Sequence, residues 1–311
     1  MGRKLPHLFR EPSNRSIKIS IEETIEEFTN AIKWLKSINA DPHNTRISHY
    51  KNHLEKFNIA YKNNSLDKFY QKQSIGEHVL LLSEIEEILG VYRFLSTSSS
   101  KEFLKKVKQT LKGGLIPADE KTASSSNRPR NILFELYLAS ICTSAGFSVS
   151  LNDNADITIN FENREIFIEC KRPQFDHKVN SSIKSAVSQL KSRYNSSSNP
   201  DSARGVIAIS TSKIITKGNK FRTISSEEVL TFESYNFFME FISSHKKKWN
   251  AKAESKTLAV ILFLNLPTFL REKGTIFINQ GIGACPIEKL KKEDFSLAER
   301  FFKKLESSTI K

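Results

Sequence analysis

The chain has 311 residues, of which 38% are hydrophobic and 26% are charged, so it can bury a substantial core. Its 11 glycines and 9 prolines are too few for a collagen-like or largely disordered chain. No apolar stretch approaches the about 18 residues of a transmembrane helix, and the basic start lacks the apolar run of a secretory signal. The three cysteines, Cys142, Cys170 and Cys285, follow neither a disulfide framework nor a zinc spacing. We therefore expect a cytoplasmic protein of about two domains, without a membrane partner.

The formal net charge of +14 is shared between both halves of the chain. Residues 1–130 contain 22 Lys and Arg against 15 Asp and Glu, and the remainder contains 26 against 19, so each part carries +7. A basic balance of this size favours a polyanionic partner bound through phosphate contacts. Solubility alone would explain the charge equally well, so charge narrows the class of partner without naming it.

The first third of the chain predicts a mostly helical domain over residues 1–112, after an irregular basic lead at residues 1–16. Ser20 and Glu23 form a capping box that begins the first helix. Further helices are predicted from Asp41-Pro42, over 75–95 and over 101–112, where Gly113-Gly114 ends the last one. Residues 113–128 are rich in turn formers and predict a linker.

The remainder, residues 129–311, predicts an α/β domain with a central mixed sheet. Periodicity and turn residues place its elements in the order helix 129–145, strands 147–151, 155–161 and 165–171, helix 179–195, strand 205–212, helix 226–247, strand 258–266 and an edge strand at 275–278. Asn127 is the expected N-cap of the first helix, and Gly146 its expected end. The core order is therefore α-β-β-β-α-β.

Four charged residues lie where folding alone would not require them. Glu135 is the only charged residue between Arg130 and Asp153, in a largely apolar helix where an unpaired carboxylate is costly. In the strand EIFIECK, Glu169 and Lys171 share one face, and Asp156 opens the preceding strand. Taken singly, each has an ordinary explanation: an exposed helix edge, a surface ion pair worth about 0–1 kcal/mol, and a turn residue.

In combination, these residues resemble the motif set of the PD-(D/E)XK nuclease superfamily. The helical Glu135 is followed by Asp156, twelve intervening residues, and then the Glu169-x-Lys171 pattern across adjoining strands. The α-β-β-β-α-β order also resembles the restriction-endonuclease-like core of that superfamily. The likeness covers residues 129–212, and Ala155 replaces the Pro usually written before the Asp.

The resemblance implies that Asp156, Glu169 and the backbone carbonyl of Cys170 bind Mg²⁺ or Mn²⁺. It implies that Lys171 orients or deprotonates the attacking water, and that Glu135 completes the acidic cluster and reaches a second metal. These residue types suit the chemistry, because Mg²⁺ prefers oxygen ligands and keeps waters for substrate phosphates. A further candidate is Gln189, which is similar to the Gln of the Q-x3-Y element in RecB-like members, although Tyr194 follows here after four residues.

The expected function is therefore metal-dependent hydrolysis of phosphodiester bonds, most simply as a DNA endonuclease, and kinship suggests defence against foreign DNA. Two alternatives remain open: a non-catalytic nucleic-acid-binding protein that keeps the fold, and an adaptor that binds a partner protein or a second copy through its helical domain. Arg172, Lys184 and the run Lys246-Lys247-Lys248 are further candidates for phosphate contacts, and solvated surface explains them equally well. The sequence does not distinguish DNA from RNA.

Overall fold

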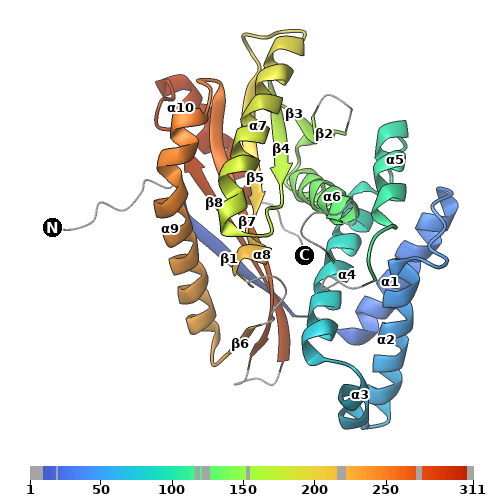
Figure 1. Cartoon of the computed structure of the whole chain (residues 1–311). Coiled ribbons are helices and arrows are strands. Elements are labelled where there is room, and N and C mark those ends of the chain that lie inside the picture. The colour runs from blue at the N-terminus through green and yellow to red at the C-terminus, as the bar shows by residue number, and fades with distance from the viewer. Residues whose placement is uncertain are drawn as a thin grey trace.

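The computed structural model describes residues 10–18, 20–115, 120, 127–151, 155–215, 222–270 and 275–306. These residues form an α/β fold around one mixed sheet, with a group of helices against one side of it (Figure 1). The predicted α/β class and mixed sheet are therefore confirmed. No described helix is long and apolar enough to cross a bilayer.

The described strands form an eight-stranded sheet in which seven follow the order β1-β8-β7-β5-β4-β3-β2 and β6 pairs with β7. Their bounds are β1 Arg10–Lys18, β2 Ser148–Ser150, β3 Ile157–Phe161, β4 Arg164–Lys171, β5 Arg204–Ser210, β6 Arg222–Ile224, β7 Thr257–Leu270 and β8 Thr275–Pro286. The β2–β3, β3–β4, β7–β8 and β1–β8 pairs are antiparallel, and β4–β5, β5–β7 and β6–β7 are parallel. The parallel centre is made of buried apolar runs, as such sheets require.

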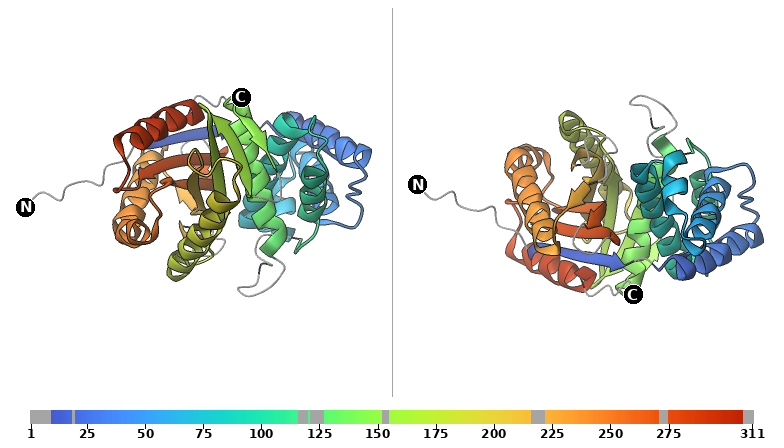
Figure 2. Two further views of the ribbon diagram at one scale, coloured as in Figure 1. Left: turned by 90° about the horizontal axis from the view of Figure 1, so that it is seen from above. Right: turned by 90° about the horizontal axis from the view of Figure 1, so that it is seen from below.

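Helices cover both faces of the sheet (Figure 2). Their bounds are α1 Ile21–Ser37, α2 Arg46–Lys62, α3 Leu66–Lys72, α4 Ile75–Leu95, α5 Lys101–Thr110, α6 Arg128–Ser144, α7 Asp176–Ser196, α8 Ser212–Ile215, α9 Glu227–Lys252 and α10 Lys292–Glu306. Helices α7 and α9 share a core with Phe167 of β4, whereas α4, α6 and α10 share another with Ile166 and Ile168. The alternation predicted for β4 therefore divides its side chains between the two layers.

The core elements appear in the predicted order, α6-β2-β3-β4-α7-β5. Gly146 ends α6 with a φ of +76°, and Glu162 and Asn163 take positive φ values in the tight β3–β4 turn. The predicted turn at residues 152–154 lies outside the described residues. Asn127 precedes α6 as expected, but its side chain makes no capping hydrogen bond.

Three predictions about element bounds are wrong. Residues 10–16 are not irregular, because they belong to β1, which pairs with β8; their sequence shows no strand alternation that would predict this. β8 is not a short edge strand, since it runs to Pro286 between β1 and β7; its glycines and amides conceal the strand pattern. The second helix begins at Arg46, where Thr45 caps Ile47, whereas Asp41 accepts from His43 in a turn.

The helices of the first third pack directly on the α/β core. One continuous apolar cluster joins α1, α2, α4 and α5 to α6 and to β3 and β4. The elements that sequence periodicity did not predict are β1, α3, α8, β6 and α10. The division into two domains at residues 113–128 stays a prediction. The shared core holds α5 beside α6.

Candidate functional site

Four elements bring the five predicted site residues together. Glu135 lies on α6, Asp156 directly precedes β3, Glu169 and Lys171 lie on β4, and Gln189 lies on α7. Ile157 pairs with Ile168 in the antiparallel β3–β4 ladder, so Asp156 comes level with Glu169 on the next strand. Residues separated by up to 54 positions therefore meet at one end of the β3–β4 hairpin. We call this group the carboxylate site.

Asp156 is held against the backbone of β4. Its Oδ2 accepts a hydrogen bond of 2.7 Å from the backbone N–H of Cys170. The Cys170 side chain itself is buried in the α6 layer, where burial raises its pKa well above the usual range, so a thiolate is not available. The predicted contribution of Cys170 is a backbone carbonyl, and this role stays a prediction.

Glu169 is fully buried but poorly compensated. Its Oε2 lies 3.6 Å from Nζ of Lys171, its Oε1 lies 3.4 Å from Nε of Arg193, and Oε2 accepts no hydrogen bond from the described residues. Burial and the nearby negative charge of Asp156 raise the pKa of Glu169 to about 7, against the opposing effects of Lys171 and Arg193. A buried carboxylate oxygen without a donor is costly, and a bound cation would compensate this cost.

Lys171 is aligned by Gln189. Its Nζ donates to Oε1 of Gln189 over 2.6 Å, and this oxygen lies 3.4 Å from the hydroxyl of Ser185 one turn earlier on α7. Tyr194, which follows Gln189 after four residues, is buried in the core and its hydroxyl lies 3.1 Å from that of Thr257. The structure thus brings Gln189 into the carboxylate site, and its role there stays a prediction.

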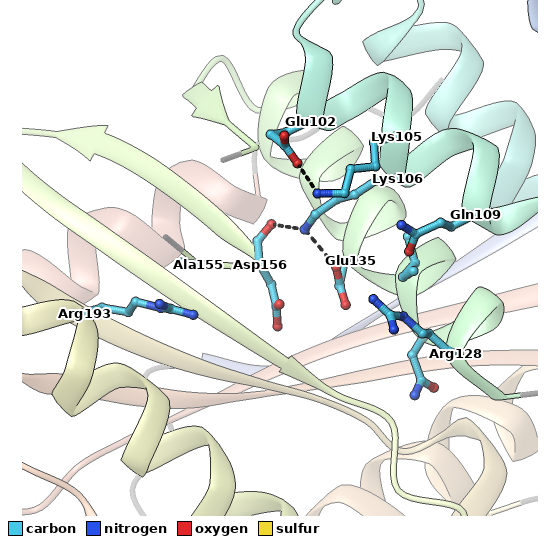
Figure 3. Close-up of a pocket in the computed structure, with 11 residues that line it drawn as sticks. Glu102, Lys105, Lys106, Gln109, Arg128, Glu135, Ala155, Asp156 and Arg193 are labelled. Atoms are coloured by element: carbon cyan, nitrogen blue, oxygen red, sulfur yellow. Dashed lines mark hydrogen bonds and ion pairs between the residues drawn. The ribbon is translucent and has the colours of Figure 1, made fainter. Parts of the chain in front are cut away.

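Lys106 of α5 also enters the site, and sequence reasoning missed it. Its Nζ donates to Oε2 of Glu135 over 2.9 Å and to the backbone carbonyl of Asp156 over 3.1 Å (Figure 3). Burial and Asp156 raise the pKa of Glu135, whereas Lys106 and Lys171 oppose the rise. Lys106 lies in a lysine-rich helix whose charges look like those of an ordinary solvated surface. No local sequence pattern distinguishes Lys106 from the other lysines of this helix.

A pocket of about 310 Å³ opens onto Glu135 and Asp156. Figure 3 shows Lys105, Lys106 and Gln109 of α5 along one side of it, with Arg128 and Arg193 approaching from other directions. Cationic side chains therefore surround the carboxylates on the open side. This arrangement suits an anionic group that approaches carboxylates which hold a metal ion.

The donor set fits a hard divalent cation. Among the described residues no three His, Cys, Asp or Glu side chains form a ready metal cage. Mg²⁺ does not need one, because it commonly uses one or two carboxylates and completes its shell with waters and substrate phosphates. The unbonded oxygen of Glu169 and the adjacent carboxylate of Asp156 provide such a partial set.

Arg172, one residue beyond Lys171, belongs to a different charged cluster. Its Nη1 contacts Glu120 at 2.8 Å, and Glu120 also pairs with Lys213. Deeper in the same region, Glu84 of α4 accepts from Arg46 at 2.6 Å and from Arg130 and Tyr50. We call Glu84, Arg46, Arg130 and Tyr50 the Glu84 network. Arg172 is thus paired with a carboxylate of the protein itself, and its contact with phosphate stays a prediction.

Comparisons with family models, with curated proteins and with solved structures found no match for this chain. Assignment of a function therefore depends on the geometry of the carboxylate site.

Proposed function

We propose that the chain is a divalent-metal-dependent nuclease with a restriction-endonuclease-like core, which hydrolyses phosphodiester bonds in DNA. The observation that carries the proposal is the convergence of Asp156, Glu169, Lys171 and Gln189 beside Glu135, on elements in the order typical of that superfamily. The net charge of +14 is consistent with a polyanionic substrate.

Asp156, Glu169 and the Cys170 carbonyl would hold Mg²⁺ or Mn²⁺. A divalent ion at this position supplies a polarised water as nucleophile and neutralises charge on the phosphate oxygens. Lys171 places its ammonium beside Glu169, where it attracts the scissile phosphate and stabilises the negative charge that develops in the transition state. Gln189 is a positioning residue, because its contact with the substrate would be made through Lys171.

One observation favours the non-catalytic alternative. Lys106 already pairs with Glu135, Arg193 lies beside Glu169, and a backbone N–H occupies one oxygen of Asp156. A site neutralised by its own cations could bind nucleic acid without cutting it. The two functions differ in whether the carboxylates are needed for bond cleavage or only for folding.

The test is a cleavage assay with purified protein, Mg²⁺ or Mn²⁺, and circular and linear DNA and RNA in single- and double-stranded forms. Glu169→Gln should abolish cleavage, because it removes a metal-binding charge while it keeps the side-chain shape. The matched control is Glu165→Gln on the same face of β4, where Glu165 accepts from Ser197 at 2.7 Å outside the site. Cleavage that survives in Glu169→Gln, or that is absent from the parent with every substrate, would contradict the proposal.

A further inference from the structure

Helix α5 presents a row of exposed lysines beside the carboxylate site. Lys101, Lys105 and Lys108 recur at intervals of four and three residues, and Lys112 follows four residues later, just beyond the helix end. This spacing places them on one side of α5, opposite Phe103, Val107 and Thr110, which are buried. We call these four residues the lysine stripe.

The stripe is continuous with the pocket at the carboxylates. A second surface hollow, of about 580 Å³, is lined by all four stripe lysines, and it shares Lys105 and Gln109 with the pocket that reaches Glu135 and Asp156. Lys106 then carries positive charge to Glu135 itself (Figure 3). Cationic side chains therefore follow one path from open surface to the proposed site of cleavage.

Folding does not require this arrangement. Like charges four residues apart on a helix repel each other and destabilise it. Helix α5 contains one acidic residue, Glu102, which pairs with Lys105 at 3.0 Å on the surface. An exposed pair of this kind contributes little to stability. A partner of opposite charge would instead stabilise the whole row.

The chemistry of the lining favours a duplex backbone. Single-stranded nucleic acids are typically bound through aromatic side chains that stack on bases. No described residue that lines either hollow is aromatic. The ten residues of α5 span roughly 15 Å, enough to follow several phosphates of one strand.

We propose that α5 is the docking surface for the phosphate backbone of duplex DNA, and that the lysine stripe leads one strand to the carboxylate site. The part of this inference that rests on the proposed function is that the strand is led to a site of cleavage. The inference assigns to the helical region the role of binding the substrate, through Lys101, Lys105, Lys108 and Lys112.

The experiment measures fluorescence anisotropy of a labelled 20-bp duplex in EDTA, over a series of salt concentrations. The variant Lys101→Gln/Lys105→Gln/Lys108→Gln/Lys112→Gln should bind at least about tenfold more weakly, with a salt slope lower by about one unit for each phosphate that it no longer neutralises. The control, Lys56→Gln/Lys62→Gln/Lys68→Gln/Lys72→Gln, removes the same charge from exposed positions on α2 and α3 and should bind within about twofold of the parent. Figure 1 shows α3 at the opposite end of the helical region from α5.

Several results would overturn the inference: a stripe variant that binds like the parent, a control that weakens as much, a parent that does not bind duplex, or tighter binding to the matching single strand. If the fourfold variant does not fold, the pairs Lys101→Gln/Lys105→Gln and Lys108→Gln/Lys112→Gln should each lower the slope by about half as much. Because binding is measured without metal, stripe-dependent affinity in a protein that never cleaves DNA would support the docking surface and refute the nuclease.

Discussion

Glu84 and Glu169 are both buried carboxylates, but their surroundings differ. Glu84 accepts from two guanidinium groups and a tyrosine hydroxyl, so Arg46 and Arg130 lower its pKa to about 2 against the opposing effect of burial. Glu169 lies 3.4 Å or more from its cations, and burial and Asp156 raise its pKa to about 7. Both carboxylate oxygens of Glu84 accept hydrogen bonds, whereas Oε2 of Glu169 accepts none from the described residues.

The two clusters also differ in access. Arg46 and Arg130 are almost fully buried, and their guanidinium groups bridge α2 and α6 to α4. The carboxylate site faces a pocket, and Lys106, Glu135 and Lys171 are each 14–16% exposed. The Glu84 network therefore holds the helical region in place, and the carboxylate site remains reachable by solvent.

The largest expected effect is on stability, in the Glu84 network. Glu84→Gln should lower the free energy of unfolding by about 3–5 kcal/mol, because it leaves two buried arginines without their counter-charge. In the parent, the lowered pKa of Glu84 means that its contribution is complete above pH 4.5 and is lost as the pH falls toward 2. Urea denaturation over this pH range checks both statements. A variant as stable as the parent at pH 7 would show that the network is not structural.

The next largest effect is on rate, at Lys171. Lys171→Ala should slow DNA cleavage by about 10²–10³-fold, as for the removal of an electrostatic donor, while duplex affinity changes far less. Folding should survive, because the side chain is partly exposed at the end of β4. A cleavage assay measures the rate, fluorescence anisotropy measures the duplex affinity, and circular dichroism shows whether the variant folds. An unfolded variant would instead make the Glu169–Lys171 pair structural.

At Glu169 we expect a pH dependence of stability opposite to that at Glu84. The raised pKa of Glu169 means that, without metal, the fold penalises the charged form, so stability should fall as the pH rises from 4.5 to 7. Glu169→Gln should remove this fall and stabilise the protein by roughly 1–3 kcal/mol at pH 8 in EDTA. Thermal or urea unfolding against pH provides the measurement. If this variant is destabilised as strongly as Glu84→Gln, the contrast between the two clusters disappears.

Sequence reasoning selected the residues of the carboxylate site through their combined resemblance to a known motif set, because each of them alone has an ordinary explanation. Glu135 in a largely apolar helix and the Glu169-x-Lys171 pattern on a strand were the local features that carried this resemblance. The α-β-β-β-α-β order was readable from local periodicity and turn residues. Strand β1 was not, because its pairing is made by backbone groups with β8, more than 250 residues away.

The Glu84 network and the entry of Lys106 and Arg193 into the site could not be predicted in this way. The partners of these side chains lie 24 to 80 residues away along the chain. On their own helices, Arg46, Lys106 and Arg193 look like solvated surface residues. Only the packing of α5 on α6, through the core they share, turns Lys106 from a surface lysine into a neighbour of Glu135.

Metal binding tests the central claim most directly. Calorimetric titration of the parent with Mn²⁺ should give weak binding without nucleic acid, because substrate phosphates would complete the coordination shell. Asp156→Asn should abolish the heat, while it keeps an acceptor for the N–H of Cys170, and the exposed control Asp201→Asn should bind as the parent does. Equal binding by Asp156→Asn and the parent would contradict the claim that Asp156 and Glu169 form the metal site.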